Sequence, residues 1–329
     1  MIFVFILIIK MNYPVYKLRD WIEVDKLNND NLSSNENACD YLFENPHKIN
    51  WNYLSANPSA FKILEKYPHK INFNNLSKNP NCIHLLSKNK KKINWNYLST
   101  NPSAFRLLKS NPKKINFYEL STNTNQEILE YFFDEYKEYY SYNYLSSNPS
   151  AINLLKKNLS LINYHMLSHN KNCMEIFKEF PERIEWFILS KNNEAIEILK
   201  SNPNKINFYQ LCLNNHKDAI KILKENIPKI EWINLSFNTG AIEILQEFPQ
   251  KINWNVLSFN RNAIELLENH KNKINYFELS YNPSIFQLDY EKMRINFKKL
   301  GDEIIEKALH PNRISAYLKK YNYQISEWF

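Results

Sequence analysis

The residues that could carry out chemistry are few and scattered. No two of the four cysteines stand in C-x-x-C spacing, so the sequence predicts neither a zinc site nor a redox pair. Of the eight histidines, His47 and His69 occupy equivalent places next to lysine, without a third ligand or a carboxylate beside them. Metal binding is therefore not expected. The cysteines are Cys39, Cys82, Cys173 and Cys212.

Nucleotide chemistry is also disfavoured. The chain holds only 2 glycines, and neither lies in a G-x-x-x-x-G-K or G-x-G-x-x-G pattern. No serine, cysteine or carboxylate stands out as a nucleophile with a base, because each candidate already fills a position in an internal repeat. The sequence thus predicts a protein that is not an enzyme and that needs no cofactor.

The repeat that places these residues is 22 residues long. Its clearest copies are Ile49 to Lys70 (INWNYLSANPSAFKILEKYPHK) and Ile93 to Lys114 (INWNYLSTNPSAFRLLKSNPKK). The spacing lengthens to 25 after Ile115 and to 24 after Ile206, and such short insertions belong at a loop or a helix end. Twelve copies begin at Leu27, Ile49, Ile71, Ile93, Ile115, Tyr140, Ile162, Ile184, Ile206, Ile230, Ile252 and Ile274.

Each repeat is predicted to form two helices. Asn50 suits the N-cap of a short first helix. Asn57 and Pro58 suit the N-cap and the first position of a second helix, which Pro68 ends. The second helix is expected to place one apolar stripe toward the core: Ala60, Phe61, Leu64 and Tyr67.

Some positions hardly vary. The equivalent of Asn57 is asparagine in all twelve repeats, and we expect it to cap its own helix and to hydrogen-bond to the neighbouring repeat. The serine after the repeated leucine changes only at Cys212, which indicates a tight interior position. An aromatic position, represented by Trp51, is interpreted as core filling, although stacked rings could also receive nucleobases.

These patterns predict an all-α solenoid of about twelve short helix-turn-helix repeats with terminal caps. At about 9–10 Å per repeat its body would be on the order of 110 Å long. The expected parts are an apolar extension (1–10), a lead-in (11–26), the solenoid (27–294) and a C-terminal cap and tail (295–329). A capping copy of the repeat is expected to begin at Ile295-Asn296-Phe297.

Two features bear on location. Residues 1–9 read MIFVFILII, which is too short to span a bilayer but leaves membrane association open; alternatively Met11 is the true start. Separated thiols in core positions favour a reducing compartment. The sequons beginning at Asn75 and Asn234 place their serines in core positions, so glycans there would disturb packing. Cytoplasmic residence is predicted.

A basic row is the first candidate binding feature. The residue before each repeat start is Lys or Arg in ten copies, interrupted by Tyr139 and Leu161. One interpretation is a solvated charge near helix C-termini. The other is sequence-independent nucleic-acid binding. The row consists of Lys48, Lys70, Lys92, Lys114, Arg183, Lys205, Lys229, Lys251, Lys273 and Arg294.

An apolar row is the second candidate. The residue between the repeated serine and the second asparagine is small or polar in the early repeats, for example Ala56 and Lys78. It becomes apolar in four consecutive repeats, which predicts a partner-binding patch. The alternative is that the C-terminal segment folds back over it. These four residues are Leu213, Phe237, Phe259 and Tyr281.

The motif K-I-N-W-x-x-L-S-x-N-P-x-A-I/F-x-x-L resembles the repeats of proteins encoded by giant, mimivirus-like DNA viruses. The lead-in Tyr16–Ile22 and the ending from Glu303 to Leu318 are similar to those chains too. The resemblance implies a viral source, residence in the host cytoplasm and this fold, but no reaction. We therefore expect a scaffold for protein–protein interaction, with nucleic-acid binding through the basic row as the alternative.

Overall fold

The computed structural model describes residues 14–308 and 310–321. The apolar segment 1–9, for which membrane association was predicted, lies outside them. The chain divides into two compact bodies: residues 20–285, and residues before 20 together with those from 286 onward. No helix within the described residues is both long and apolar enough to cross a bilayer. The predicted all-α repeat architecture is confirmed.

The larger body contains the twelve repeats. Each begins with a short first helix, whose leucine, such as Leu54, is fully buried. The first helices are α2 (Asn29–Ser34), α4 (Trp51–Ala56), α6 (Phe73–Leu76), α8 (Trp95–Ser99), α10 (Phe117–Leu120), α12 (Tyr142–Ser147), α14 (Tyr164–Leu167), α16 (Trp186–Leu189), α18 (Phe208–Leu211), α20 (Trp232–Phe237), α22 (Trp254–Phe259) and α24 (Tyr276–Leu279).

Repeats 1 to 11 continue into a second helix, which in most of them follows a 3₁₀ turn such as Pro58–Ala60. The predicted stripe needs a correction: Ala60, Ile63 and Leu64 are buried, whereas Phe61 and Tyr67 are only partly so. The second helices are α3 (Cys39–Glu44), α5 (Phe61–Lys66), α7 (Ile83–Lys88), α9 (Phe105–Lys109), α11 (Gln126–Tyr136), α13 (Ile152–Lys157), α15 (Met174–Phe177), α17 (Ile196–Ser201), α19 (Lys217–Lys224), α21 (Ile242–Glu247) and α23 (Ile264–Glu268).

The buried asparagine joins neighbouring repeats, as expected, and the buried serine does so as well. Asn57 accepts a hydrogen bond from the Ser59 amide at 2.9 Å and so caps its own turn. Its Nδ2 donates to the carbonyls of Ser33 (3.0 Å) and Asn35 (3.1 Å) in the preceding repeat. The last carbonyls of a helix have no partner inside that helix, so the next repeat satisfies them. The Ser33 hydroxyl in turn accepts from the Asn50 amide at 2.9 Å.

The same bonds join the last repeat to the first. The Asn28 amide donates to the Ser280 hydroxyl at 2.8 Å, and Asn35 Nδ2 donates to the carbonyls of Ser280 and Asn282, both at 3.1 Å. Asn31 Nδ2 also donates to the Phe277 carbonyl at 2.8 Å. Repeats 1 and 12 therefore meet in an ordinary joint. The predicted elongated body, on the order of 110 Å by helix-packing distances, is wrong, because the array closes on itself.

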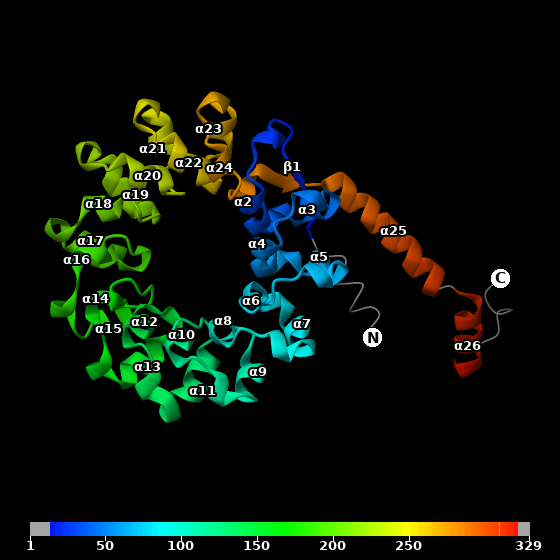
Figure 1. The fold of residues 1–329 in the computed structure, drawn as a ribbon. Helices are drawn as coiled ribbons and strands as arrows, with labels where there is room; N and C mark the ends of the chain where they lie inside the picture. The colour runs from blue at the N-terminus through cyan, green and yellow to red at the C-terminus, as the bar shows by residue number, and fades with distance from the viewer. Residues whose placement is uncertain (1–13, 309, 322–329) are drawn as a thin grey trace. The chain divides into compact units, whose positions relative to one another are not determined.

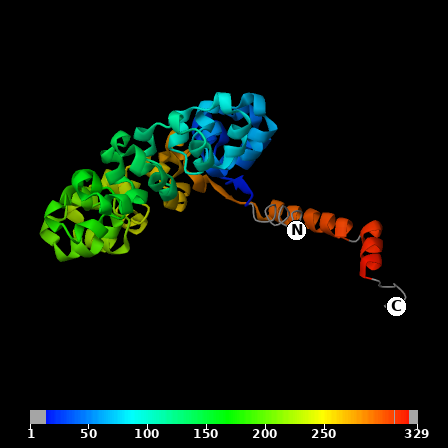
Figure 2. The same ribbon diagram turned by 90° about the horizontal axis from the view of Figure 1, so that it is seen from below.

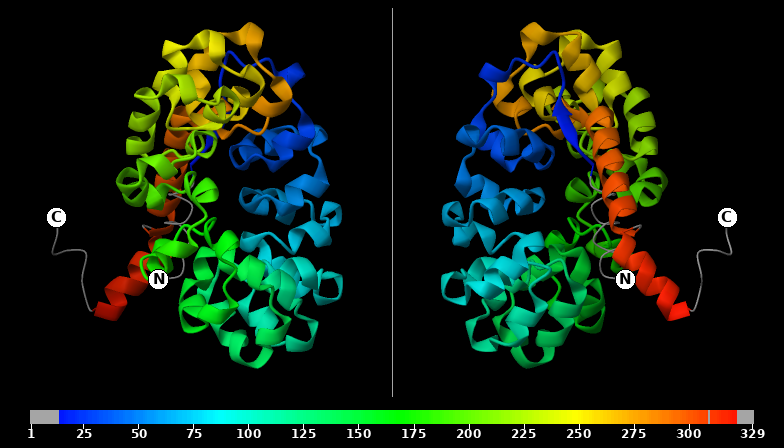
Figure 3. Two further views of the ribbon diagram at one scale, coloured as in Figure 1. Left: turned by 90° about the vertical axis from the view of Figure 1, so that its left-hand side faces the viewer. Right: turned by 90° about the vertical axis from the view of Figure 1, so that its right-hand side faces the viewer.

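The closed path is visible from several sides. Around most of the ring the first helices form the inner layer and the second helices the outer layer (Figure 1). Figure 2 shows the same succession of repeats from below. The first repeat, in blue, lies beside the last, in orange (Figures 1 and 3).

The last repeat is composite, with parts from both ends of the chain. After Ile285 the chain leaves the helical pattern, so repeat 12 has no second helix of its own. Residues of the lead-in supply its final turn: Val24–Lys26 form a 3₁₀ turn of the kind that ends each of repeats 1 to 11. Lys26 Nζ lies 5.2 Å from the centre of the Tyr276 ring, and Tyr276 donates to Glu23 at 3.0 Å. Residues of the lead-in therefore take part in closing the ring.

The smaller body has its own elements. Strand β1 (Tyr16–Leu18) pairs antiparallel with β2 (Phe286–Leu288), with Tyr16 opposite Leu288. Helices α25 (Tyr290–Ala308) and α26 (Pro311–Tyr321) follow. Ile295–Phe297, expected to start a capping repeat, lie inside α25, so that prediction is wrong. The residues after Phe297 lack the Ser and Asn that form a joint, and one continuous helix forms instead.

Candidate functional site

The predicted apolar row lies at the ends of four neighbouring first helices. Phe237 and Phe259 are the last residues of α20 and α22, and Leu213 and Tyr281 follow α18 and α24 by two residues. Leu213, Phe237 and Phe259 are 36%, 50% and 38% exposed, while Tyr281 is half-buried. The ring centres of Phe237 and Phe259 are 5.4 Å apart, and those of Phe259 and Tyr281 are 6.2 Å apart. The structure therefore brings the row together.

A second apolar row lies beside it and was missed by the sequence analysis. It occupies the fourth position of the repeat, one helical turn before the first row, so both rows share a helix face. The signal was present, because asparagine dominates this position in repeats 2 to 6, whereas apolar residues occupy it in repeats 8, 9, 10 and 12. Four side chains form this row, each 52–53% exposed: Phe187, Tyr209, Ile233 and Phe277.

The change at the fourth position also removes a hydrogen bond between repeats. In the early part of the ring the asparagine accepts from the first asparagine of the next repeat, as Asn52 does from Asn72 at 2.7 Å. An apolar side chain cannot accept that bond. It instead enlarges the exposed apolar surface. We call the two rows together the apolar face: Phe187, Tyr209, Leu213, Ile233, Phe237, Phe259, Phe277 and Tyr281.

A groove runs between the first row and the loops that follow the first helices. One hollow of about 420 Å³ is lined by Leu213, Phe237 and Phe259 on one side and by Thr239 and Arg261 among the loop residues. A second hollow of about 380 Å³ adjoins it, because both include Leu213 and Asn215. Its lining is more polar and includes His169, Lys171, Lys191 and Glu194.

The glycine that follows Thr239 of the groove has a local cause. A Cβ at Gly240 would lie 3.0 Å from the Asn215 carbonyl oxygen, in the repeat that carries the two-residue insertion. Most other repeats have Ser or Asn at this position, for example Ser59 and Asn262. The close approach of the preceding loop explains why this repeat has glycine at a position where most others have Ser or Asn.

The basic row lies at the C-terminal ends of the 3₁₀ turns, and most of its side chains are exposed. Five of its members cover the aromatic ring of their own repeat at 4.4–5.4 Å from the ring centre: Lys92 over Phe73, Lys114 over Trp95, Arg183 over Tyr164, Lys229 over Phe208 and Lys273 over Trp254. Each such contact contributes about 0.5–1 kcal/mol at an exposed site. These rings are half-buried, not fully interior as core filling implied.

One member of the basic row differs from the rest. Arg294 lies in α25 and not on a repeat turn. Its expected place is taken by Lys26, which covers Tyr276 across the closing joint. The remaining candidates, Lys48, Lys70, Lys205 and Lys251, lie on the 3₁₀ turns as the repeat requires.

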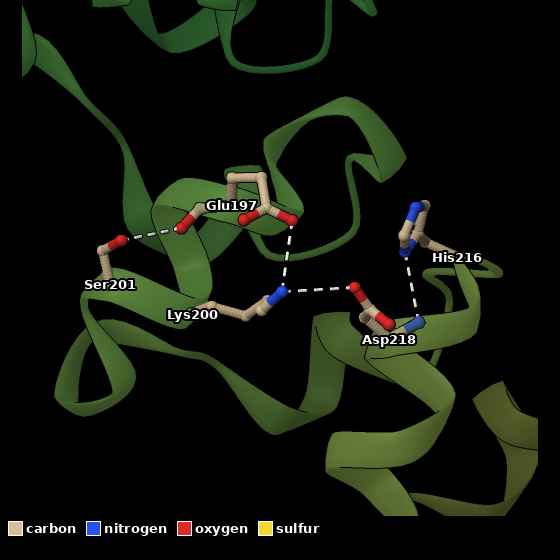
Figure 4. A network of polar contacts seen from close by, with 5 residues as sticks. All are labelled: Glu197, Lys200, Ser201, His216 and Asp218. Carbon is tan, nitrogen blue, oxygen red and sulfur yellow. Dashed lines mark hydrogen bonds and ion pairs between the residues drawn. The ribbon is translucent and has the colours of Figure 1, made fainter.

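One polar cluster contains residue types found in hydrolytic sites (Figure 4). Lys200 Nζ contacts Glu197 at 3.2 Å and Asp218 at 3.3 Å, which raises the pKa of the lysine. The Ser201 hydroxyl, however, donates to the carbonyl of Glu197, and His216 caps α19 by accepting from the Asp218 amide. These are exposed ion pairs and a helix cap that join neighbouring second helices, and exposed pairs of this kind contribute little to stability.

The thiols offer no reactive group. Burial raises the pKa of Cys39, Cys82 and Cys173 to about 12 and that of Cys212 to about 11. A thiol with so high a pKa is almost entirely protonated near neutral pH. Within the described part of the chain, no three His, Cys, Asp or Glu side chains gather in a way that could hold a metal ion.

Comparison with protein families, curated proteins and solved structures finds no match to this chain. The ring and its apolar face are therefore the features that bear on its function.

Proposed function

We propose that this protein is a non-enzymatic ring scaffold that binds another protein across the apolar face. The observation that carries the proposal is the alignment of two exposed apolar rows on neighbouring first helices, the second row being interrupted by Asn255 in repeat 11. At about 200 Å² for each large side chain, the exposed fractions leave an apolar surface on the order of 600 Å². This is at the upper limit of what monomeric proteins usually expose.

The residue choice supports binding over packing. The joint positions keep their serine and asparagine around the ring, with Cys212 as the one replacement of the serine, so the fold does not require aromatics on the apolar face. Aromatic rings enclosed by a partner supply much of the binding energy in protein interfaces, often ≥ 2 kcal/mol for a single hot-spot residue. Four protonated thiols, three of them buried, are compatible with the host cytoplasm as the place of action. The resemblance to giant-virus repeats suggests that the partner is a host or viral protein.

A photo-crosslinking residue, p-benzoylphenylalanine, at Phe237 tests the proposal in cells that produce the protein. Tyr118 is the matched control, because it is 53% exposed on α10 on the other side of the ring. We expect one dominant crosslinked protein from position 237 and none of it from position 118. Equal crosslinks from both positions, or none from 237, would overturn the proposal.

Nucleic-acid binding through the basic row is the second candidate. It is supported by the exposure of the row and weakened by the use of its cations over aromatic rings. If it holds, affinity for DNA or RNA falls steeply with salt, by about 0.7–0.9 log units per phosphate contacted for each log unit of salt. Absence of binding at low salt removes this candidate.

A further inference from the structure

The groove beside the apolar face changes character along its length. Toward repeat 12 its wall is apolar, formed by Leu213, Phe237 and Phe259. Toward repeat 7 it is lined by Lys171, Lys191 and His169, with Glu194 as the one carboxylate. Because the two hollows share Leu213 and Asn215, a single segment can contact both ends.

The basic end has uncompensated positive charge. Neither Lys171 nor Lys191 has an ion-pair partner among the described residues. The pKa of His169 is lowered, first by burial and then by the charges of Lys191 and His165, so the same charges act on the groove. Arg261 adds a further cation on the loop side of the apolar end.

We infer that the bound segment is acidic as well as apolar: it places aliphatic or aromatic side chains along repeats 9 to 12 and carboxylates against Lys171 and Lys191. This rests on the proposed function, because it assigns the chemistry of the partner to the same face. At about 9–10 Å per repeat, the five steps from repeat 7 to repeat 12 cover about 45 Å. A peptide in extended conformation covers that distance with about 14 residues at 3.3 Å each.

Three fluorescein-labelled 15-residue peptides provide the test against the full-length protein. All carry the same apolar half, rich in Leu and Phe; the other half holds three Glu, three Gln or three Lys. By fluorescence anisotropy we expect the Glu peptide to bind about fivefold to tenfold more tightly than the Gln peptide, since each partly exposed ion pair adds modestly. The Lys peptide is expected to bind least.

Variants separate this inference from the proposed function. K171Q/K191Q should bring the Glu and Gln peptides within about twofold of each other, while K88Q/K90Q, which changes exposed lysines of repeat 3, should leave the difference intact. F237S/F259S should abolish binding of the Gln peptide. Equal affinity of the three peptides for the unchanged protein would overturn the inference and leave the proposed function standing. If no peptide binds, both are contradicted.

Discussion

Repeats 1 to 7 and repeats 8 to 12 are built on the same joints but present different surfaces. Asn101 in the first part and Asn260 in the second each donate to two carbonyls of the preceding repeat, at 3.0–3.1 Å. Where the two parts meet, Asn192 instead donates to the Asn170 carbonyl at 2.9 Å and to the Cys173 sulfur at 3.3 Å. The fourth position is mainly asparagine in the first part and mainly apolar in the second. The fold therefore requires the serine and asparagine of the joints, whereas it tolerates a change of residue class at the fourth position.

The largest expected effect tests whether all joints are equivalent. Asn101→Ala, Asn260→Ala and Asn35→Ala each remove a helix cap and the donor to a buried carbonyl, which costs about 2–4 kcal/mol of unfolding free energy. Urea denaturation measures it. Because Asn35 lies at the closing joint, a loss there much smaller than at Asn101 would show that the ring is open in solution.

The buried thiols predict a dependence on pH that both parts of the ring share. Each thiol has a folded pKa above its ordinary value of 9.0, so its stabilising contribution is present below pH 9 and is lost as pH rises toward 12. Between pH 8 and pH 10 we expect a loss of about 1 kcal/mol for each thiol. Cys82 and Cys173 occupy the repeat position that Ala60 holds in repeat 2. The variant C82A/C173A should therefore remove about half of the decrease in the free energy of unfolding. An unchanged decrease in the variant would assign it to other groups.

The smallest effect concerns the basic row. Lys92→Gln and Lys229→Gln, one in each part of the ring, remove a cation from an aromatic face and should each cost about 0.5–1 kcal/mol. Lys205→Gln is the control, because no ring contact involves it among the described residues. If the control costs as much as the other two in the same denaturation assay, the aromatic contact is not the cause.

The 22-residue spacing was enough to predict the helices, the capping asparagines and the interior position of Cys212, because these depend on local residues and adjacent repeats. Closure could not be predicted in the same way. Curvature accumulates from a small rotation at each joint, and no single repeat reports the sum. Lys26 nevertheless indicated closure, because it precedes Leu27 as lysine precedes most other repeat starts. In the structure Lys26 supplies the cation that covers Tyr276 of repeat 12.

The candidate site was partly predictable for a related reason. The change at Leu213, Phe237, Phe259 and Tyr281 stood out because the other repeats have small or polar residues there. The fourth-position row was missed, because only the aromatic third position of the first helix was considered. Only the structure separates the half-buried third position, covered by lysine, from the exposed fourth position represented by Phe187.

The most direct test of the account compares F237S/F259S with Y118S/Y144S, which removes an exposed tyrosine pair whose ring centres lie 5.1 Å apart in repeats 5 and 6. Affinity for the partner crosslinked at position 237 is measured by titration calorimetry, with urea denaturation in parallel. We expect F237S/F259S to lower affinity at least 100-fold, equivalent to about 2.7 kcal/mol, and to change stability by less than about 1 kcal/mol. Y118S/Y144S should retain full affinity. A loss of several kcal/mol of stability in F237S/F259S, with affinity for the partner unchanged, would show that the apolar face is internal packing and contradict the account.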